Sequence, residues 1–206
     1  MPRPFSSEER ERIRRTLLER GREVFSTGGV RGTTILQLCR AAGISSGAFY
    51  SFFPSKEHLL LEILEDEERV LRREFSTCLR TQEVTAATFA SCLRQSLDAA
   101  VGNPLIRRLL DEEEYQILAR RMPPGRLEAH IQGDIAFARP LITELQERGT
   151  MVSLSPEVIT GMLRGLLMLS LHRREIGEEV YEEVMDLLLE FVARGLLGGD
   201  CSDDNS

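Results

Sequence analysis

Side chains that could contact a nucleic acid gather in one short stretch, GISSGAFYSFFPSKEHL, residues 43–59. Tyr50 offers a hydroxyl that can reach a phosphate oxygen, and Lys56 an ammonium that can hold a phosphate beside backbone N–H groups. Small residues fill most of the stretch before them, so a helix backbone could approach base edges closely. The alternative is a tight helical corner with an aromatic core, which any one of these features alone would favour.

Two short predicted helices would position these side chains. Apolar residues recur at helical spacing over residues 35–42, a threonine can cap this helix, and Gly43 ends it. Ser45 can cap a second short helix, which Pro54 terminates. Two short helices joined by a tight turn that contains glycine form a helix-turn-helix, whose second helix enters the major groove.

Longer helices are expected on both sides. Ser6 and Glu9 have the spacing of a capping box, and the helix that they open should end at Gly28-Gly29. A fourth helix begins after Ser55 and extends to about residue 80. Phe52 and Phe53 should dock the second short helix onto this fourth helix.

The rest of the chain also favours helices, with no hairpin signal. The expected helices span about 85–101, 104–120, 125–148, 156–173 and 177–197, with a kink or break at Pro140. The predicted fold is all-α, with a three-helix DNA-binding head at residues 1–55. A helical effector-binding and dimerisation domain at 56–197 and a disordered acidic tail at 198–206 would follow.

Charge is distributed unevenly along the chain. Residues 1–60 carry ten Lys and Arg against six Glu, whereas the whole 206-residue chain has a net charge of −7. A basic head on an acidic body suggests that the head meets a polyanion. The alternative is a chance fluctuation on solvated helix faces.

The run as a whole resembles the TetR/AcrR family of bacterial transcriptional regulators, over residues 10–60. The residues that carry the resemblance are Gly32-Thr33-Thr34-Ile35-x-x-Leu38-Cys39-x-x-Ala42-Gly43-Ile44-Ser45-x-Gly47-Ala48-Phe49-Tyr50-x-Phe52-Phe53-x-Ser55-Lys56-x-x-Leu59. The resemblance implies a repressor that binds a palindromic operator as a homodimer and is released by a small-molecule effector.

By position, the family's DNA contacts fall on Thr33, Thr34, Ser45, Ser46, Gly47, Ala48, Tyr50, Ser51 and Lys56. Two of these depart from the family pattern, since Ser46 stands where Lys or Arg is frequent and Ser51 where His is frequent. Serine hydroxyls read bases weakly. We therefore expect affinity to depend on phosphate contacts and operator shape. Arg3, Arg10, Arg14 and Arg15 could add phosphate or minor-groove contacts, although a solvated helix face is the simpler interpretation.

The last two long helices favour dimerisation. Helix 156–173 is apolar on more than one side, and helix 177–197 adds a further apolar stripe, so a monomer would expose a large apolar patch. A four-helix bundle formed by two copies would bury it. The expected interface residues are Met162, Leu163, Leu166, Leu167, Val184, Leu188 and Phe191.

The middle helices would then hold an effector, which we expect to be largely apolar. Candidate lining residues are Phe75, Leu79, Phe89, Leu93, Leu97, Tyr115, Met122, His130, Phe137 and Leu141, each of which could instead be plain core. His130 and Asp134 share a helical face and could bind a cation or orient a polar ligand.

Other classes of function find little support. We expect no cofactor, no metal centre and no enzyme, because phosphate loops, nucleophile elbows and paired Glu-x-x-His motifs are missing. The N-terminus has no apolar signal-peptide core and no apolar run approaches a membrane span, so we expect a cytoplasmic protein. The four cysteines should be inert and reduced, a disulfide between Cys78 and Cys92 being the less favoured alternative. The competing function is a helical adaptor whose DNA-binding head has degenerated.

Overall fold

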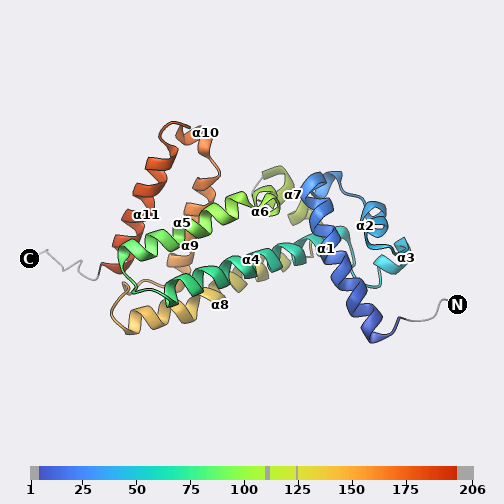
Figure 1. The fold of residues 1–206 in the computed structure, drawn as a ribbon, viewed down its shortest axis with the longest axis horizontal. Helices are drawn as coiled ribbons and strands as arrows, with labels where there is room; N and C mark the ends of the chain where they lie inside the picture. The colour runs from blue at the N-terminus through green and yellow to red at the C-terminus, as the bar shows by residue number, and fades with distance from the viewer. Residues whose placement is uncertain (1–4, 110–111, 124, 199–206) are drawn as a thin grey trace, which may run out of the picture. The chain divides into compact units, whose positions relative to one another are not determined.

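The computed structural model describes residues 5–109, 112–123 and 125–198. These residues form helices and connecting turns with no strand among them, which confirms the all-α prediction. The helices are α1 (Ser7–Gly32), α2 (Ile35–Ala42), α3 (Ser46–Phe49), α4 (Lys56–Arg80), α5 (Ala86–Gly102), α6 (Pro104–Leu109), α7 (Glu112–Arg121), α8 (Arg126–Glu147), α9 (Pro156–Ser170), α10 (Arg173–Ile176) and α11 (Tyr181–Leu197) (Figure 1).

The chain forms two compact units. The first contains residues 1–69 and 103–124, and the second residues 70–102 and 125–206. Helix α4 contributes residues to both, so the two units share one continuous helix. None of the described helices is long and apolar enough to cross a membrane.

Local caps define the first three helices. The predicted capping box of α1 is present, with the Ser6 hydroxyl accepting from the Glu9 N–H and the Glu9 carboxylate accepting from the Ser6 N–H. Thr34 and Gln37 form a second capping box at α2. Gly43 ends α2 in the left-handed conformation, with a φ of 69°, which a residue with a side chain adopts at a cost.

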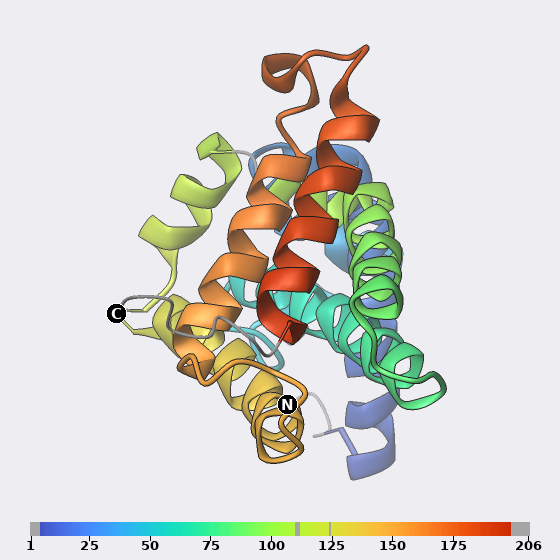
Figure 2. The same ribbon diagram turned by 90° about the vertical axis from the view of Figure 1, so that its left-hand side faces the viewer.

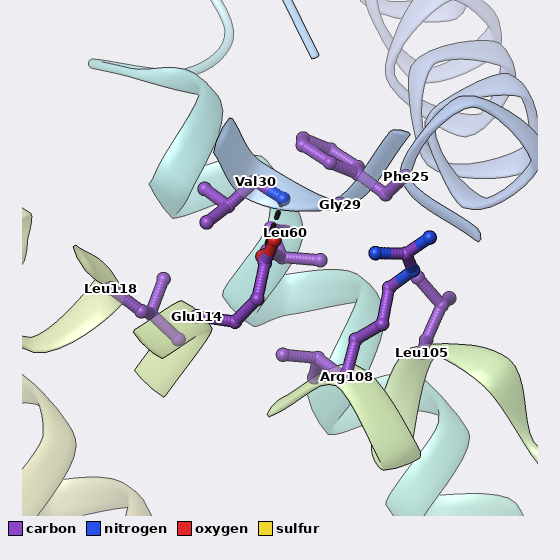
Figure 3. Close-up of a pocket in the computed structure, with 9 residues that line it drawn as sticks. Phe25, Gly29, Val30, Leu60, Leu105, Arg108, Glu114 and Leu118 are labelled. Carbon is purple, nitrogen blue, oxygen red and sulfur yellow. Dashed lines mark hydrogen bonds between the residues drawn. The ribbon is translucent and has the colours of Figure 1, made fainter. Parts of the chain in front are cut away.

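The end of α1 is tied to α6 and α7 within the first unit (Figure 3). Helical geometry breaks at Gly29, as predicted, and one further turn leads to Gly32. The Val30 N–H donates to the Glu114 carboxylate at 2.7 Å, while Arg108 donates to the carbonyls of Ser26 and Thr27. Side chains of α6 and α7 therefore satisfy backbone groups at the end of α1.

The second unit packs around one apolar core. Helices α5, α9 and α11 lie side by side in both views, and α8 packs against α9 (Figures 1 and 2). Fifteen buried residues form the core, among them Phe89, Ile159, Met185 and Leu189. Ile159 and Leu166 place one face of α9 in this core.

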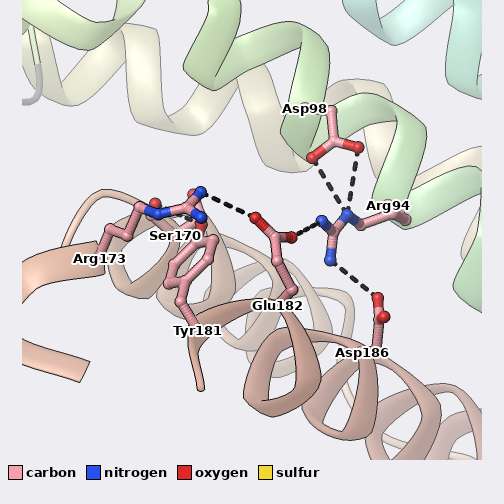
Figure 4. A network of polar contacts seen from close by, with 7 residues as sticks. All are labelled: Arg94, Asp98, Ser170, Arg173, Tyr181, Glu182 and Asp186. Carbon is pink, nitrogen blue, oxygen red and sulfur yellow. Dashed lines mark hydrogen bonds and ion pairs between the residues drawn. The ribbon is translucent and has the colours of Figure 1, made fainter. Parts of the chain in front are cut away.

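Arg94 on α5 joins the unit's ion-pair network (Figure 4). Its guanidinium contacts Asp98 on its own helix and Glu182 and Asp186 on α11, and Arg173 contacts Glu182 from the other side. The hydrogen bond from Arg94, assisted by Arg173, holds the pKa of Glu182 below its ordinary value.

Several helix boundaries differ from the predicted ones. The single helix expected over 104–120 appears as α6 and α7, and the helix expected from 177 begins at Tyr181 after the short α10. Helix α8 continues through Pro140 without the predicted break. Pro140 is exposed, so water can satisfy the carbonyl that loses its helical partner there.

The expectation of four reduced cysteines is wrong for one pair. Cys78 and Cys92 form a disulfide that joins α4 to α5, because the two helices bring their Cα atoms to 5.9 Å. Cys39 is free and buried, and Cys201 lies outside the described residues. Gly198 caps the C-terminal end of α11. The rest of the predicted acidic tail also lies outside the described residues.

Candidate functional site

Helix α3 presents a row of small and hydroxyl-bearing residues to solvent. Ser46 and Gly47 of α3 are exposed, as are Tyr50 and Ser51 directly after it, Tyr50 by 59%. Beneath them Phe49 is completely buried and packs at its ring against Phe53. The exposed face is thus fixed by a rigid aromatic anchor on the opposite side of the same short helix.

The N-terminal end of that helix is also accessible. Ser45 caps α3 through a hydrogen bond from the Ala48 N–H to its hydroxyl at 3.2 Å. Ala48 is half-buried, and Thr34, the cap of α2, is exposed. Backbone N–H groups and hydroxyls at two helix starts are the groups that hold phosphate oxygens in protein–DNA interfaces.

Two arginines of α1 brace this region, a role that the sequence did not reveal. Arg10 donates to the Ser51 carbonyl at 3.1 Å and lies 5.0 Å from the centre of the Phe52 ring. Arg14 pairs with Glu62. Phe52, predicted to dock onto the fourth helix, is half-buried, and its ring centre lies 5.9 Å from that of Phe5. No sequence signal marks these contacts, because the partners are 41 or more residues apart.

Lys56 and Thr33 make contacts within the head that differ from those of residues that only hold a phosphate. The Lys56 ammonium donates to the carbonyls of Val30 and Thr33 at 2.6 and 2.5 Å, which uses two of its three N–H groups. Thr33 is 1% exposed and its hydroxyl has no hydrogen-bond partner. The Thr33 side chain therefore belongs to the packing of the head, not to its exposed face.

A second candidate site is an open cleft of about 260 Å³ within the second unit. Its walls come from α4, α5, α8 and α9. The lining residues are Leu71, Arg72, Phe75, Leu93, Ser96, Leu97, Ala100, Asp134, Phe137, Ala138, Leu141, Thr160, Leu163, Arg164 and Leu167. Most of these are apolar, as is usual for small-molecule sites.

The predicted effector residues divide between this cleft and other places. Phe75, Leu93, Leu97, Phe137 and Leu141 line it. Leu79 and Phe89 are instead buried in the core of the same unit, and Met122 is buried in the first unit. His130 is half-buried on α8 and does not line the cleft, and the side chain of Tyr115 lies outside the described part of the chain.

Three charged side chains meet in the cleft wall. Asp134 accepts from Arg72 on α4 through one oxygen and from Arg164 on α9 through the other, the latter at 3.3 Å. The Arg72 guanidinium also lies 5.6 Å from the centre of the Phe137 ring. Asp134 thus pairs with arginines, and the described residues contain no cluster of three potential metal ligands.

The apolar residues of α9 and α11 lie on two sides. Leu166 is buried in the core of its own unit, and Leu163 and Leu167 line the cleft. Met162 and Phe191 remain exposed, by 38% and 62%, while Val184 and Leu188 are half-buried. Other exposed apolar residues on or beside these helices are Val158, Met168, Leu169, Val180 and Leu187.

Comparison with known proteins places the head in a defined family. The model of the bacterial regulatory proteins, tetR family, matches residues 17–63. The HTH-type transcriptional regulator UidR of Escherichia coli (strain K12) is 26% identical over 165 residues, which cover 78% of each chain. The nucleoid occlusion factor SlmA of Actinobacillus pleuropneumoniae is 32% identical over 85 residues, 41% of this chain and 42% of SlmA.

Solved structures share the fold over nearly the whole chain. A tetR-family transcriptional regulator from Pectobacterium atrosepticum superposes with a TM-score of 0.71 at 24% identity, covering 94% of this chain and 98% of that one. The matched segment contains all of α2 and α3 and most of α1. Residues 17–63 therefore match the N-terminal domain of the bacterial regulatory proteins, tetR family, and 94% of the chain shares its fold with a solved structure of a tetR-family regulator.

Proposed function

We propose that this chain is a ligand-responsive transcriptional repressor that binds a palindromic operator as a homodimer. The observation that carries the proposal is the exposed face of α3, where small and hydroxyl residues stand above the fully buried Phe49. Such a face can enter a major groove without steric conflict, while Thr34 and Tyr50 reach phosphates. Regulators of this family bind operator DNA, usually as dimers, which supports the same assignment.

The proposed effector site is the cleft of the second unit. Leu71, Arg72 and Phe75 of α4 line it, and the same helix begins in the head at Lys56. A molecule that binds better to one geometry of α4 than to another would shift the population of DNA-binding-competent protein. In the proposed domain division, the head ends at residue 55 and α4 opens the effector-binding part.

The first test is selection of random duplexes by the purified protein at moderate salt. Enrichment of a palindrome supports the repressor, whereas retention that falls with salt and enriches no sequence favours a degenerate head and an adaptor. Tyr50→Phe keeps the ring and removes the hydroxyl, so we expect roughly five- to tenfold weaker operator binding, the value of one hydrogen bond. Ser91→Ala, which removes an exposed hydroxyl from α5, should leave binding unchanged.

Lys56→Met separates two roles of that lysine. If the ammonium contacts phosphate, the slope of log K against log salt should fall by about one. If it only holds the carbonyls of Val30 and Thr33, the melting temperature should fall with the salt slope unchanged. Unchanged stability and an unchanged slope together would exclude both roles.

A further inference from the structure

We propose that the cleft of the second unit selects a small apolar carboxylate, whose acid group binds Arg164. The inference deepens the proposed function and rests on it only in treating the bound molecule as the effector. It is carried by the charged group in the cleft wall, where two arginines share one aspartate in an otherwise apolar lining.

The sharing of Asp134 is unequal. Arg72 makes the close ion pair with one oxygen, while Arg164 reaches the other oxygen at 3.3 Å. Within the described part of the chain, this is the hydrogen bond that the Arg164 guanidinium makes. A guanidinium has five N–H donors, so most of those of Arg164 are available to a molecule in the cleft that it lines.

Partial burial should make the available Arg164 donors selective for a negatively charged group. The side chains of Arg72, Asp134 and Arg164 are 25%, 26% and 32% exposed, so their charges are partly removed from water. A charged group in such a place is stabilised by a partner of opposite sign, and it destabilises the protein when it has none. A carboxylate matches the planar fork of a guanidinium with two parallel hydrogen bonds.

Other ligand classes fit this wall less well. An amine would have to compete with two guanidinium groups for Asp134 and would be repelled by both. A neutral alcohol would offer no negative charge to the Arg164 donors that Asp134 does not use. Thr160 offers no alternative donor, since its hydroxyl already donates to the Pro156 carbonyl at 2.7 Å.

The other residues that line the cleft indicate what the rest of the ligand should be. Leu71, Phe75, Leu97, Phe137 and Leu163 give the cleft an apolar surface, and its volume of about 260 Å³ lies just below the usual range of ligand sites. A compact aromatic or short aliphatic body would be desolvated there. The ligand class is therefore a monocarboxylic acid with one apolar body.

The decisive experiment is calorimetric titration of the full chain with matched probes. 4-Phenylbutyrate is compared with 4-phenylbutan-1-ol and 4-phenylbutylamine, and octanoate with octan-1-ol. We expect saturable binding of at least one acid, about tenfold or more tighter than its alcohol. Equal affinity for acid and alcohol, tighter binding of the amine, or no saturable binding of either acid overturns the inference.

Variants locate the acid group. Arg164→Gln should abolish the preference for acid over alcohol, and Arg164→Lys should keep a weaker preference. Arg139→Gln is the matched control, because Arg139 is an exposed arginine of α8 that pairs with Glu157 outside the cleft. A preference that survives Arg164→Gln overturns the assignment. If circular dichroism shows that Arg164→Gln is unfolded, Arg164→Lys serves as the test. An acid-to-alcohol affinity ratio in Arg164→Lys equal to that of the wild type would contradict the role of Arg164.

The same samples distinguish this inference from the proposed function. Operator retention by the ligand-free protein tests the repressor and does not depend on Arg164. Selection of a palindrome without acid binding overturns the carboxylate alone, and acid binding without selection of any sequence overturns the repressor alone. If both hold, the acid that binds should release the operator from the wild type and not from Arg164→Gln.

Discussion

Gly29 combines a φ of 62° with an extended ψ at a point where two side chains approach the backbone. A Cβ added there would lie 2.3 Å from Glu114 Oε1 and 2.9 Å from an Arg108 nitrogen. Glycine is therefore required twice, once by the backbone conformation and once by the space. The turn that it permits brings the Val30 N–H to Glu114.

Gly29→Ala should lower the free energy of unfolding by more than about 1 kcal/mol, because the alanine is strained and also displaces Glu114. Denaturant unfolding followed by circular dichroism measures this. Gly32→Ala is the control, since its φ is not positive and an added Cβ meets nothing within 4 Å. Equal effects of the two substitutions would contradict the account.

At the scale of elements, α5 is held by two kinds of cross-link. The disulfide between Cys78 and Cys92 joins it to α4, beside an edge-to-face contact of Phe75 and Phe89 at 6.0 Å. The Arg94 network joins it to α11 (Figure 4). Because α4 and α5 both line the cleft, these links also hold its walls.

Breaking the disulfide should destabilise the second unit. The bond closes a loop over a sequence separation of 14, for which loop-closure entropy gives about 3 kcal/mol. Cys78→Ser should lower unfolding stability by roughly that amount, and a reductant should bring the wild type to the same value. The variant itself should not respond to reductant. A wild type with identical stability under oxidising and reducing conditions would contradict this.

The ion-pair network should make stability depend on acid pH. Since the hydrogen bond from Arg94 lowers the pKa of Glu182 in the folded protein, Glu182 stabilises the fold above its unfolded pKa. That contribution is lost as the pH falls through the lower, folded value. Glu182→Gln should be less stable than the wild type at neutral pH, and the difference should begin to narrow near pH 4.5 and close as the pH falls through the lower, folded pKa of Glu182. Glu183→Gln, at an exposed neighbour, should show no such pH-dependent difference.

At the scale of the whole molecule, two compact units share α4, and the second exposes apolar side chains of α9 and α11. Phe191 is 62% exposed and Leu187 43%, although a monomer in water gains nothing from exposing them. A second copy of the chain that buries this face would explain why these exposed residues are apolar. The same arrangement would give a palindromic operator two reading helices.

Phe191→Glu should therefore shift the protein from dimer to monomer, because it places a charge in the proposed apolar interface. Sedimentation equilibrium measures the association, and operator affinity should fall with it. Val70→Glu is the control, since Val70 on α4 is 44% exposed and lies on neither α9 nor α11. Dimers of undiminished stability in Phe191→Glu would remove this residue from the interface.

The helices of the head and their caps could be predicted from the sequence. The Ser6–Glu9 box, the Thr34 cap, the left-handed Gly43 and the Ser45 cap each involve residues within a few positions of one another. Local hydrogen bonds and backbone preferences of this kind are written in short sequence patterns. The helix-turn-helix, with Phe49 turned inward, follows from them directly.

The second unit could not be predicted to the same depth, because α9 is apolar nearly all round. Periodicity alone does not tell that Leu166 faces the core, Leu163 the cleft and Met162 the solvent. Which neighbour covers each face is decided by packing.

The sequence by itself determined the helices of the head, their caps and the small residues on the exposed face of α3, because those depend on neighbours along the chain. Only the tertiary structure brought Arg72, Asp134 and Arg164 together, or placed Arg10 on Ser51, across 30 or more residues. It likewise gave Cys78 a disulfide partner in place of a free thiol. Contacts of this kind depend on how helices pack. Hydrophobic periodicity shows which face of a helix is buried, but not which residue of another helix it meets.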